Sequence, residues 1–481
     1  MNANPRLVRV AREALHERGL LDDFPREVDA EVSALRHAAS DPSARDMRDL
    51  LWASIDNDDS RDLDQLSVAA EPHAHRDGSD TIYVAIADVD ALVKKGSPVD
   101  TRARTNTTSI YTAAGNFPML PERLCTDLTS LNPEEDRLAI VVEMNVNAAG
   151  EVARASLFRA TVRNHAKLAY DGVAAWLDGQ AAAPPALDAV SGLPAQLRRQ
   201  HAIAQRLKRM RESRGALDLD TLEARPIMSD RTLSDLAPDE SNHAKELIED
   251  FMVAANGAIA RFLTGRGYAY LRRVLPIPER WDRIRILARA NGGRLPAQPD
   301  AIALDAFLRE RRAAEPDTFP DLSLSVIKLL GFGEYALDGT GHFALAVDTY
   351  THATAPNRRY PDLVTQRVLK AALSGGASPY ARNELAALAD HCTQQQKAAA
   401  KVERRVAKSA AAQILSSRIG QTFSAIVTGA SEKGTWVRIR HPTTEGRVIR
   451  GERGLDVGDR VTVKLLRTDI DRGFIDFAAP E

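Results

Sequence analysis

The spacing of apolar residues predicts a helical region over residues 1–45. One helical pattern is centred on Val10 and stops at Gly19, and a second surrounds Val32. Two short helices joined by a brief connection fit a helix-turn-helix unit. They fit equally well a small helical cap on the next domain, and the pattern does not separate these alternatives.

Residues 46–418 alternate between two kinds of apolar pattern. Short β-branched runs such as residues 81–88 predict strands, and the longer amphipathic pattern over residues 245–264 predicts a helix. Residues 382–417 are rich in Ala and contain no Gly or Pro, so we expect one long helix there. This mixture predicts an α+β domain.

The tail, residues 419–481, changes to short alternating segments that predict a five-stranded β-barrel of the OB fold. The five predicted strands cover residues 422–427, 435–440, 447–450, 461–466 and 473–477. The predicted organisation is therefore a helical amino-terminal domain, an α+β domain and a barrel.

Charge is distributed unevenly along the chain. The 481 residues carry a net charge of -2, yet the segment from His352 to the end contains 21 Lys and Arg against 13 Asp and Glu. Local cationic surface of this kind is what phosphate binding requires, although an ordinary surface would also fit the count.

The remaining composition favours a cytoplasmic protein. Cys125 and Cys392 lie far apart in sequence and have no metal-ligand partners nearby, so we expect two structural thiols in a reducing compartment. Charges at Arg6, Arg9 and Glu13 interrupt the amino terminus, so we expect neither a signal peptide nor a membrane span there.

The stretch of residues 54–66 contains the densest group of acids. Its aspartates are Asp56, Asp58, Asp59, Asp62 and Asp64. Carboxylates this close repel one another unless a cation holds them, and ligands that are all oxygens suit magnesium or manganese. A solvated acidic loop is the alternative. An EF-hand is excluded, because no Gly stands at the required sixth position.

Three later segments give the acidic stretch a context. Residues 111–121, 248–256 and 351–362, taken in order with residues 54–66, resemble the catalytic domain of the ribonuclease II family, the processive 3′-to-5′ exoribonucleases. The resemblance implies an RNB-type catalytic domain over residues 46–418. It also implies a short variant without the amino-terminal cold-shock domains that family members often carry.

The resemblance implies a catalytic set of Asp56, Asp62, Asp64 and Arg358. The three aspartates match acidic metal-binding positions of the family, and Arg358 matches the arginine that grips phosphate beside the metals. Gln65 stands where the family usually has a fourth Asp. A Gln carbonyl is a neutral ligand, so the metal-binding set is expected to be Asp56, Asp62, Asp64 and Gln65, with weaker binding than four carboxylates would give.

The resemblance also implies residues that contact RNA near its 3′ end. Tyr111 matches an aromatic residue that stacks on a base, and Glu403 matches an acid near the last nucleotide. Tyr268 is the candidate for a second stacking ring. A turn position for Tyr111 and a core position for Tyr268 are the alternatives.

The tail resembles the RNA-binding barrel first described in a ribosomal protein. Phe423 and Trp436 would then offer stacking surfaces, and Arg438, Arg440 and Arg447 would contact the RNA backbone. Either aromatic ring could instead face the barrel core.

These features together predict an exoribonuclease that degrades single-stranded RNA from a free 3′ end to nucleoside 5′-monophosphates, with Mg²⁺ or Mn²⁺ as the cofactor. We expect a cytoplasmic monomer with no organic cofactor and no membrane partner. The alternative is an RNA-binding regulator of the same fold that has lost turnover through Gln65. A DNA-binding factor that uses the amino-terminal helices is a third possibility.

Overall fold

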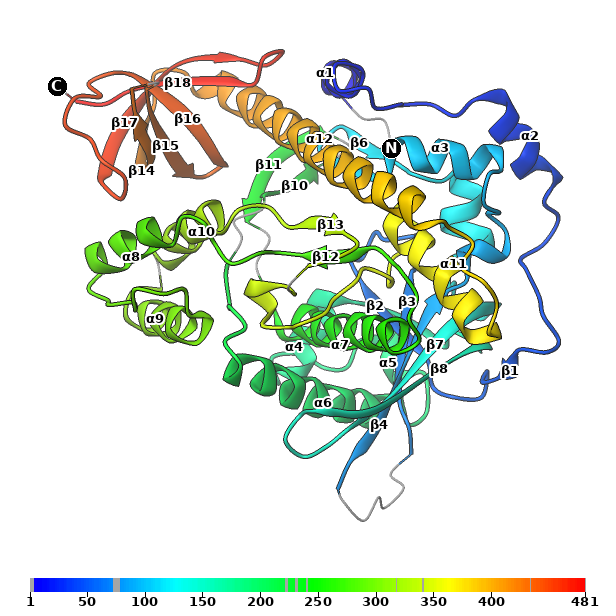
Figure 1. Cartoon of the computed structure of the whole chain (residues 1–481). Helices are drawn as coiled ribbons and strands as arrows, with labels where there is room; N and C mark the ends of the chain where they lie inside the picture. Colours follow the sequence, from blue (N-terminus) through cyan, green and yellow to red (C-terminus); the bar gives the residue numbers. More distant parts are fainter. Residues whose placement is uncertain are drawn as a thin grey trace.

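A seven-stranded mixed sheet forms the centre of the main body in the computed structural model of the chain (Figure 1). The structure describes residues 4–71, 78–220, 224–229, 232–238, 241–316, 318–339, 341–432 and 434–480. In spatial order the strands are β1 (Arg45–Asp46), β8 (Val152–Arg163), β7 (Asp136–Val146), β4 (Asp80–Ala87), β3 (Gln65–Ala69), β2 (Ala53–Asp56) and β9 (Ala166–Ala169). Strand β2 runs antiparallel to β3 and parallel to β9. The carboxyl end of β2 therefore lies between the start of β3 and the end of β9.

Helices pack against this sheet and bury its apolar positions. Helix α7 contacts β2, β4, β7 and β8, and α6 contacts β3. The helices of the body are α3 (Pro98–Asn106), α4 (Tyr170–Leu177), α5 (Pro185–Asp188), α6 (Leu193–Ser213), α7 (His243–Gly265) and α11 (Tyr360–Ser374). The predicted helix over residues 245–264 is confirmed by α7.

Smaller elements surround the body. Helices α8 (Trp281–Ala290), α9 (Ala301–Ala314) and α10 (Phe319–Leu330) share a separate apolar core. Two short hairpins and one antiparallel pair of strands distant in sequence complete this part of the chain. They are β5 (Ile110–Thr112) with β6 (Gly115–Phe117), β10 (Ala224–Ser229) with β11 (Thr232–Pro238), and β12 (Arg272–Val274) with β13 (Glu334–Ala336).

The long helix α12 (Arg382–Leu415) connects the main body to the barrel, as Figure 1 shows in orange. Its range confirms the single helix that the Ala-rich segment predicts. Helix α1 (Pro5–His16) buries Leu7 and Leu15 against Val402 and Val406 of α12, whereas α2 (Arg26–Ala34) packs against α3. The two amino-terminal helices thus cover different neighbours, an arrangement closer to a cap than to a helix-turn-helix unit.

The tail forms a closed five-stranded barrel in the order β14-β15-β16-β18-β17. The strands are β14 (Thr422–Ser431), β15 (Gly434–Arg440), β16 (Thr443–Arg450), β17 (Arg460–Asp469) and β18 (Phe474–Ala478). Ala411 and Leu415 at the end of α12 join the barrel core. Both the α+β class and the predicted barrel are confirmed.

Two further expectations concern thiols and membranes. Cys125 and Cys392 are free and buried, and burial raises the pKa of each to about 12, as expected for structural thiols. Among the helices within the described ranges, none combines the length and the apolar character needed to cross a membrane.

Candidate active site

Ser130 holds the acidic loop between β2 and β3 at two points. Asp56 is the last residue of β2, and Gln65 is the first residue of β3. Between them, the backbone N–H of buried Leu63 donates to Ser130 Oγ at 3.0 Å, and Ser130 Oγ donates to the carbonyl of Arg61 at 3.0 Å. The loop therefore has a defined path although it contains no regular structure.

Asp64 is held by residues almost 300 positions away in sequence. Its carboxylate is only 2% exposed and accepts from the backbone N–H of Asn357 at 3.1 Å and from Arg358 Nε at 2.8 Å. Thr129 Oγ1 donates to Asn357 Oδ1 at 2.6 Å. These contacts place the segment before α11 directly over the acidic loop.

Asp62 is held by the residue that the resemblance assigns to base stacking. The Tyr111 hydroxyl donates to Asp62 Oδ2 at 2.8 Å, and the Tyr111 backbone N–H donates to Glu403 Oε1 at 3.3 Å. Tyr111 is 41% exposed, so part of its side chain remains open to solvent. The β5–β6 hairpin, the acidic loop and α12 thus meet at this residue.

The carboxylates of the site repel one another in a poorly solvated environment. Burial and the charge of Asp64 raise the pKa of Asp56 to about 7, and Arg358 opposes this shift. Burial also raises the pKa of Asp64 to about 6, again opposed by Arg358. Oδ2 of Asp56 is buried and has no hydrogen-bond partner in the part of the chain that the structure describes. A cation placed here would relieve the repulsion and satisfy this oxygen.

The carboxylate oxygens of the site suit a divalent cation, but the described side chains do not form a preassembled metal site. Among the described residues, no three His, Cys, Asp or Glu side chains form a cluster that could hold a metal. The contacts explain why: Tyr111 engages Asp62 and Arg358 engages Asp64. Metal binding would therefore compete with these two partners, and Asp56 carries the oxygen that is free to accept a cation first.

The structure does not bring Tyr268 to this site. Its hydroxyl donates to the carbonyl of Gly376, just beyond the end of α11. The other end of α11 begins two residues after Arg358, and 15 helical residues span about 22 Å. Tyr268 also packs on the main core. The geometry thus favours the core alternative for this residue.

The barrel residues differ in their exposure. Phe423 is partly buried and meets Phe477 edge-to-face with ring centroids 6.3 Å apart. Trp436 is also partly buried, and it pairs across the strands with exposed Arg447. The structure places these two neighbours on β15 and β16.

Two further barrel arginines, Arg438 and Arg440, differ in their exposure to solvent. Arg438 is only 9% exposed and forms an ion pair with Asp321 of α10, whereas Arg440 is exposed. Arg438 is thus directed toward α10, and of the three arginines expected to contact RNA, Arg440 and Arg447 are exposed. The two residues lie two apart on β15 and share one face of the strand, so the difference follows from the ion pair that covers Arg438 and from the position of Arg440 at the end of the strand.

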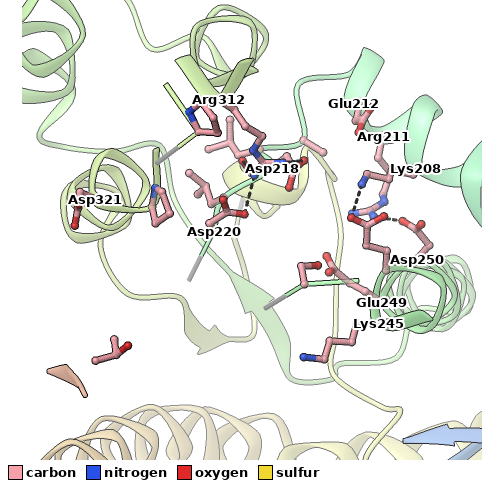
Figure 2. Close-up of a pocket in the computed structure, with 18 of the residues that line it drawn as sticks. Lys208, Arg211, Glu212, Asp218, Asp220, Lys245, Glu249, Asp250, Arg312 and Asp321 are labelled. Carbon is pink, nitrogen blue, oxygen red and sulfur yellow. Dashed lines mark hydrogen bonds and ion pairs between the residues drawn. The ribbon is translucent and has the colours of Figure 1, made fainter. Parts of the chain in front are cut away.

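A cleft of about 880 Å³ lies between the barrel and the main body (Figure 2). Lys208, Arg211, Asp250 and Asp321 are among its lining residues. Arg211 forms an ion pair with Asp250, whose pKa burial raises to about 7. The lining carries both signs of charge, so it does not by itself form a cationic track for RNA.

Sequence reasoning did not find the residues that hold the acidic loop. Ser130, Thr129 and Asn357 position Asp62 to Asp64 through hydrogen bonds across the fold. Asn357 lies next to Arg358, and this adjacency was the only signal available. Nothing in the local sequence distinguishes Ser130 from an ordinary loop serine.

Comparison with known proteins identifies the family. Residues 44–375 match the RNB domain and residues 421–479 match the RNase II-type exonuclease C-terminal S1 domain. The chain belongs to the RNB domain family, which confirms the resemblance seen in the sequence. Ribonuclease R of Escherichia coli (strain K12) is 29% identical over 494 residues, a match that covers 95% of this chain and 60% of that protein.

Solved structures show the same fold. Mycoplasma genitalium RNase R in complex with ribose methylated single-stranded RNA matches with a TM-score of 0.89 and 22% identity, over 99% of this chain and 78% of that chain. Yeast Ssd1, a pseudonuclease, matches with a TM-score of 0.75 and 18% identity, over 98% and 58% of the two chains. The fold therefore occurs in proteins described as nucleases and in one described as a pseudonuclease.

Proposed function

We propose that this protein is a metal-dependent 3′-to-5′ exoribonuclease that hydrolyses single-stranded RNA to nucleoside 5′-monophosphates. The observation that carries the proposal is that Tyr111 contacts Asp62 and Arg358 contacts Asp64, in the acidic loop that begins at Asp56. These residues come from segments far apart in sequence, and together they supply acids, a stacking ring and a phosphate-binding cation. The chain spans about 60% of the length of the E. coli relative, whose name supports an activity on RNA.

In the proposed reaction a water oxygen attacks the phosphorus of the last phosphodiester linkage. The bond from phosphorus to the 3′ oxygen of the preceding nucleotide breaks, that oxygen gains a proton, and a nucleoside 5′-monophosphate leaves. Mg²⁺ or Mn²⁺ bound by Asp56, Asp62 and Asp64, with Gln65 as a neutral ligand, would activate the water and offset charge on phosphate. We assign one or two such ions.

The protein's own residues position the RNA. Arg358 keeps a planar guanidinium beside the acidic loop, where it would contact non-bridging phosphate oxygens. Tyr111 would stack on a base near the 3′ end, with Glu403 fixing the hairpin that carries it. We expect a cytoplasmic monomer without an organic cofactor. The division into residues 1–45, 46–418 and 419–481 remains our proposed domain organisation.

The direct test is digestion of a 5′-labelled single-stranded RNA with Mg²⁺. We expect progressive shortening from the 3′ end with release of mononucleotides, and no reaction in excess chelator. A blocked 3′ end on a matched RNA should slow the reaction strongly. Internal cleavage products or activity in chelator would overturn the proposal.

A non-catalytic RNA-binding protein is the second candidate. Gln65 favours it, because the site lacks one carboxylate that the family usually has, and Ssd1 shows that this fold exists as a pseudonuclease. Intact RNA that stays bound in the digestion assay would support this candidate.

Asp56 gives a prediction for metal binding that does not depend on turnover. Its pKa is raised to about 7 in the folded protein, so its charge destabilises the metal-free fold above pH 7, and this cost falls as pH decreases toward the unfolded pKa near 4. Asp56→Asn should therefore raise the Tm at pH 8 and have little effect at pH 4. Added Mg²⁺ should raise the Tm of the parent and not that of the variant. Scanning calorimetry with and without Mg²⁺ measures both effects, and an equal Mg²⁺ response in the two proteins would remove Asp56 from the ligand set.

The barrel gives a prediction with an internal control. Arg447→Gln removes an exposed cation beside Trp436, and each lost phosphate contact should lower the logarithmic salt slope for single-stranded RNA by about 0.7. Arg438→Gln should leave this slope unchanged and lower stability instead, because Arg438 is paired with Asp321. Fluorescence anisotropy over a range of salt concentrations checks both. Equal slopes for Arg447→Gln and the parent would mean that this face of the barrel does not contact RNA.

A further inference from the structure

A lysine on the edge strand of the sheet stands beside the acidic loop. Lys167 lies in β9, where it is paired in parallel register with Ser54 of β2. Side chains two residues apart on a strand share a face, so Lys167 lies on the same face as Asp56. Ile55 and Leu168 occupy the opposite face and belong to the main core.

The ammonium group of Lys167 reaches the loop itself. Nζ donates to the carbonyl of Asp58 at 3.1 Å, two residues after Asp56. An ammonium has three N–H donors, and among the described residues the Asp58 carbonyl is its hydrogen-bond acceptor. Two donors are therefore available to a substrate at the edge of the site.

The positions of the two site cations are complementary. Arg358 contacts Asp64, next to β3, whereas Lys167 approaches from β9, and β2 with Asp56 lies between these strands. The field of Lys167 also reaches Asp56, whose pKa is raised by burial and by Asp64 and lowered by Arg358 and Lys167. A phosphate bound over Asp56 would thus have one cation on each side.

We infer that Lys167 is a catalytic residue that contacts a non-bridging oxygen of the reacting phosphate, opposite Arg358. This assignment rests on the proposed exoribonuclease function and extends it to one more residue. Because Gln65 replaces a carboxylate, the site offers less negative charge for metal ions than the usual family set, and a fixed ammonium supplies positive charge that needs no ligand.

Three variants separate this role from a structural one. Lys167→Met removes the charge and the hydrogen bond, Lys167→Gln keeps an N–H donor without charge, and Lys167→Arg keeps the charge. Lys94→Met is the matched control, since Lys94 Nζ donates to the carbonyl of Asp90 at 2.7 Å, in the short 3-10 helix Val89–Ala91 before α3. We expect kcat on a short RNA to fall about 100-fold in the Met and Gln variants and much less in the Arg variant. Parental kcat in Lys167→Gln, with a loss only in Lys167→Met, would show that Lys167 merely tethers the loop and would overturn the inference.

A phosphorothioate at the last linkage tests contact with the phosphate directly. Sulfur at the oxygen that Lys167 touches should slow the parent and Lys94→Met more than it slows Lys167→Met. An identical sulfur effect for both diastereomers in all three proteins would overturn the inference.

Binding in chelator distinguishes failure of the inference from failure of the proposed function. If the parent releases no mononucleotide, the proposed function fails, and the salt slope for binding a short RNA then decides the role of Lys167. A slope lower by about 0.7 in Lys167→Met than in Lys94→Met supports the phosphate contact, and equal slopes overturn it.

Discussion

Replacing Asp64 by Asn is expected to lower kcat by at least about 100-fold, a loss of about 2.7 kcal/mol in transition-state stabilisation. Asp64 is buried and accepts from Arg358 and from the backbone of Asn357, so it both offers charge to a metal and holds the phosphate-binding arginine. The Asn side chain has nearly the same shape and keeps one oxygen acceptor. RNA binding should therefore survive, because a negative charge is removed from the neighbourhood of phosphate.

The matched control for this variant is Asp100→Asn. Asp100 is also buried, and it likewise accepts from a backbone N–H, that of Gly96 at 2.8 Å, and from a guanidinium, that of Arg367 at 2.7 Å. It should lose stability without losing kcat per folded molecule. Single-turnover digestion and thermal unfolding separate these effects. Parental kcat in Asp64→Asn would refute the proposed site, and loss of RNA binding together with a collapsed Tm would mean that Asp64 chiefly holds the fold.

The sequence predicts well those helices and strands whose structure follows from residues close together in the chain. The barrel strands follow from alternation of apolar residues, and α12 follows from a long segment without helix breakers. Each strand predicted in the tail overlaps an observed strand, because side-chain alternation reports directly which face is buried. The packing of the amino-terminal helices could not be predicted, since an amphipathic helix does not specify what covers its apolar face.

The candidate site shows where local reasoning stops. The resemblance selects Asp62 and Tyr111, and the structure joins them by a hydrogen bond that no spacing rule predicts. Ser130 and Asn357 hold the acidic loop from distant segments, so their roles exist only after folding. Tyr268 illustrates the opposite case, since residue type alone cannot tell a stacking ring from one that packs at the far end of a helix.

The same limit applies to charge. In the sequence, three barrel arginines are equally good candidates for contacts to RNA, namely Arg438, Arg440 and Arg447. Only the fold shows that Arg438 faces Asp321. Net charge in the tail therefore overstates the cationic surface that RNA can reach. Arg358 differs from these, because its partner is a carboxylate of the candidate site.

Arg358→Lys is expected to lower kcat/KM by about 100-fold, or about 2.7 kcal/mol, although it preserves the charge. Nε of Arg358 donates to Asp64, and the side chain remains 40% exposed, so a substrate can still reach it. A guanidinium can hold Asp64 and grip phosphate at the same time. A single ammonium group must divide its donors between the two over a shorter reach.

Arg359→Lys controls for the effect of the substitution on this segment. Arg359 is the next residue along and donates to Asp362 at 2.7 Å within the turn that starts α11. The main effect of Arg359→Lys should be a lower Tm, with only a small loss in kcat/KM. Steady-state digestion of a short labelled RNA gives kcat/KM for both variants, with Tm as the measure of folding. If Arg358→Lys retained the parental kcat/KM, phosphate would have to be held by another group, and the fork geometry of Arg358 would have no part in the reaction.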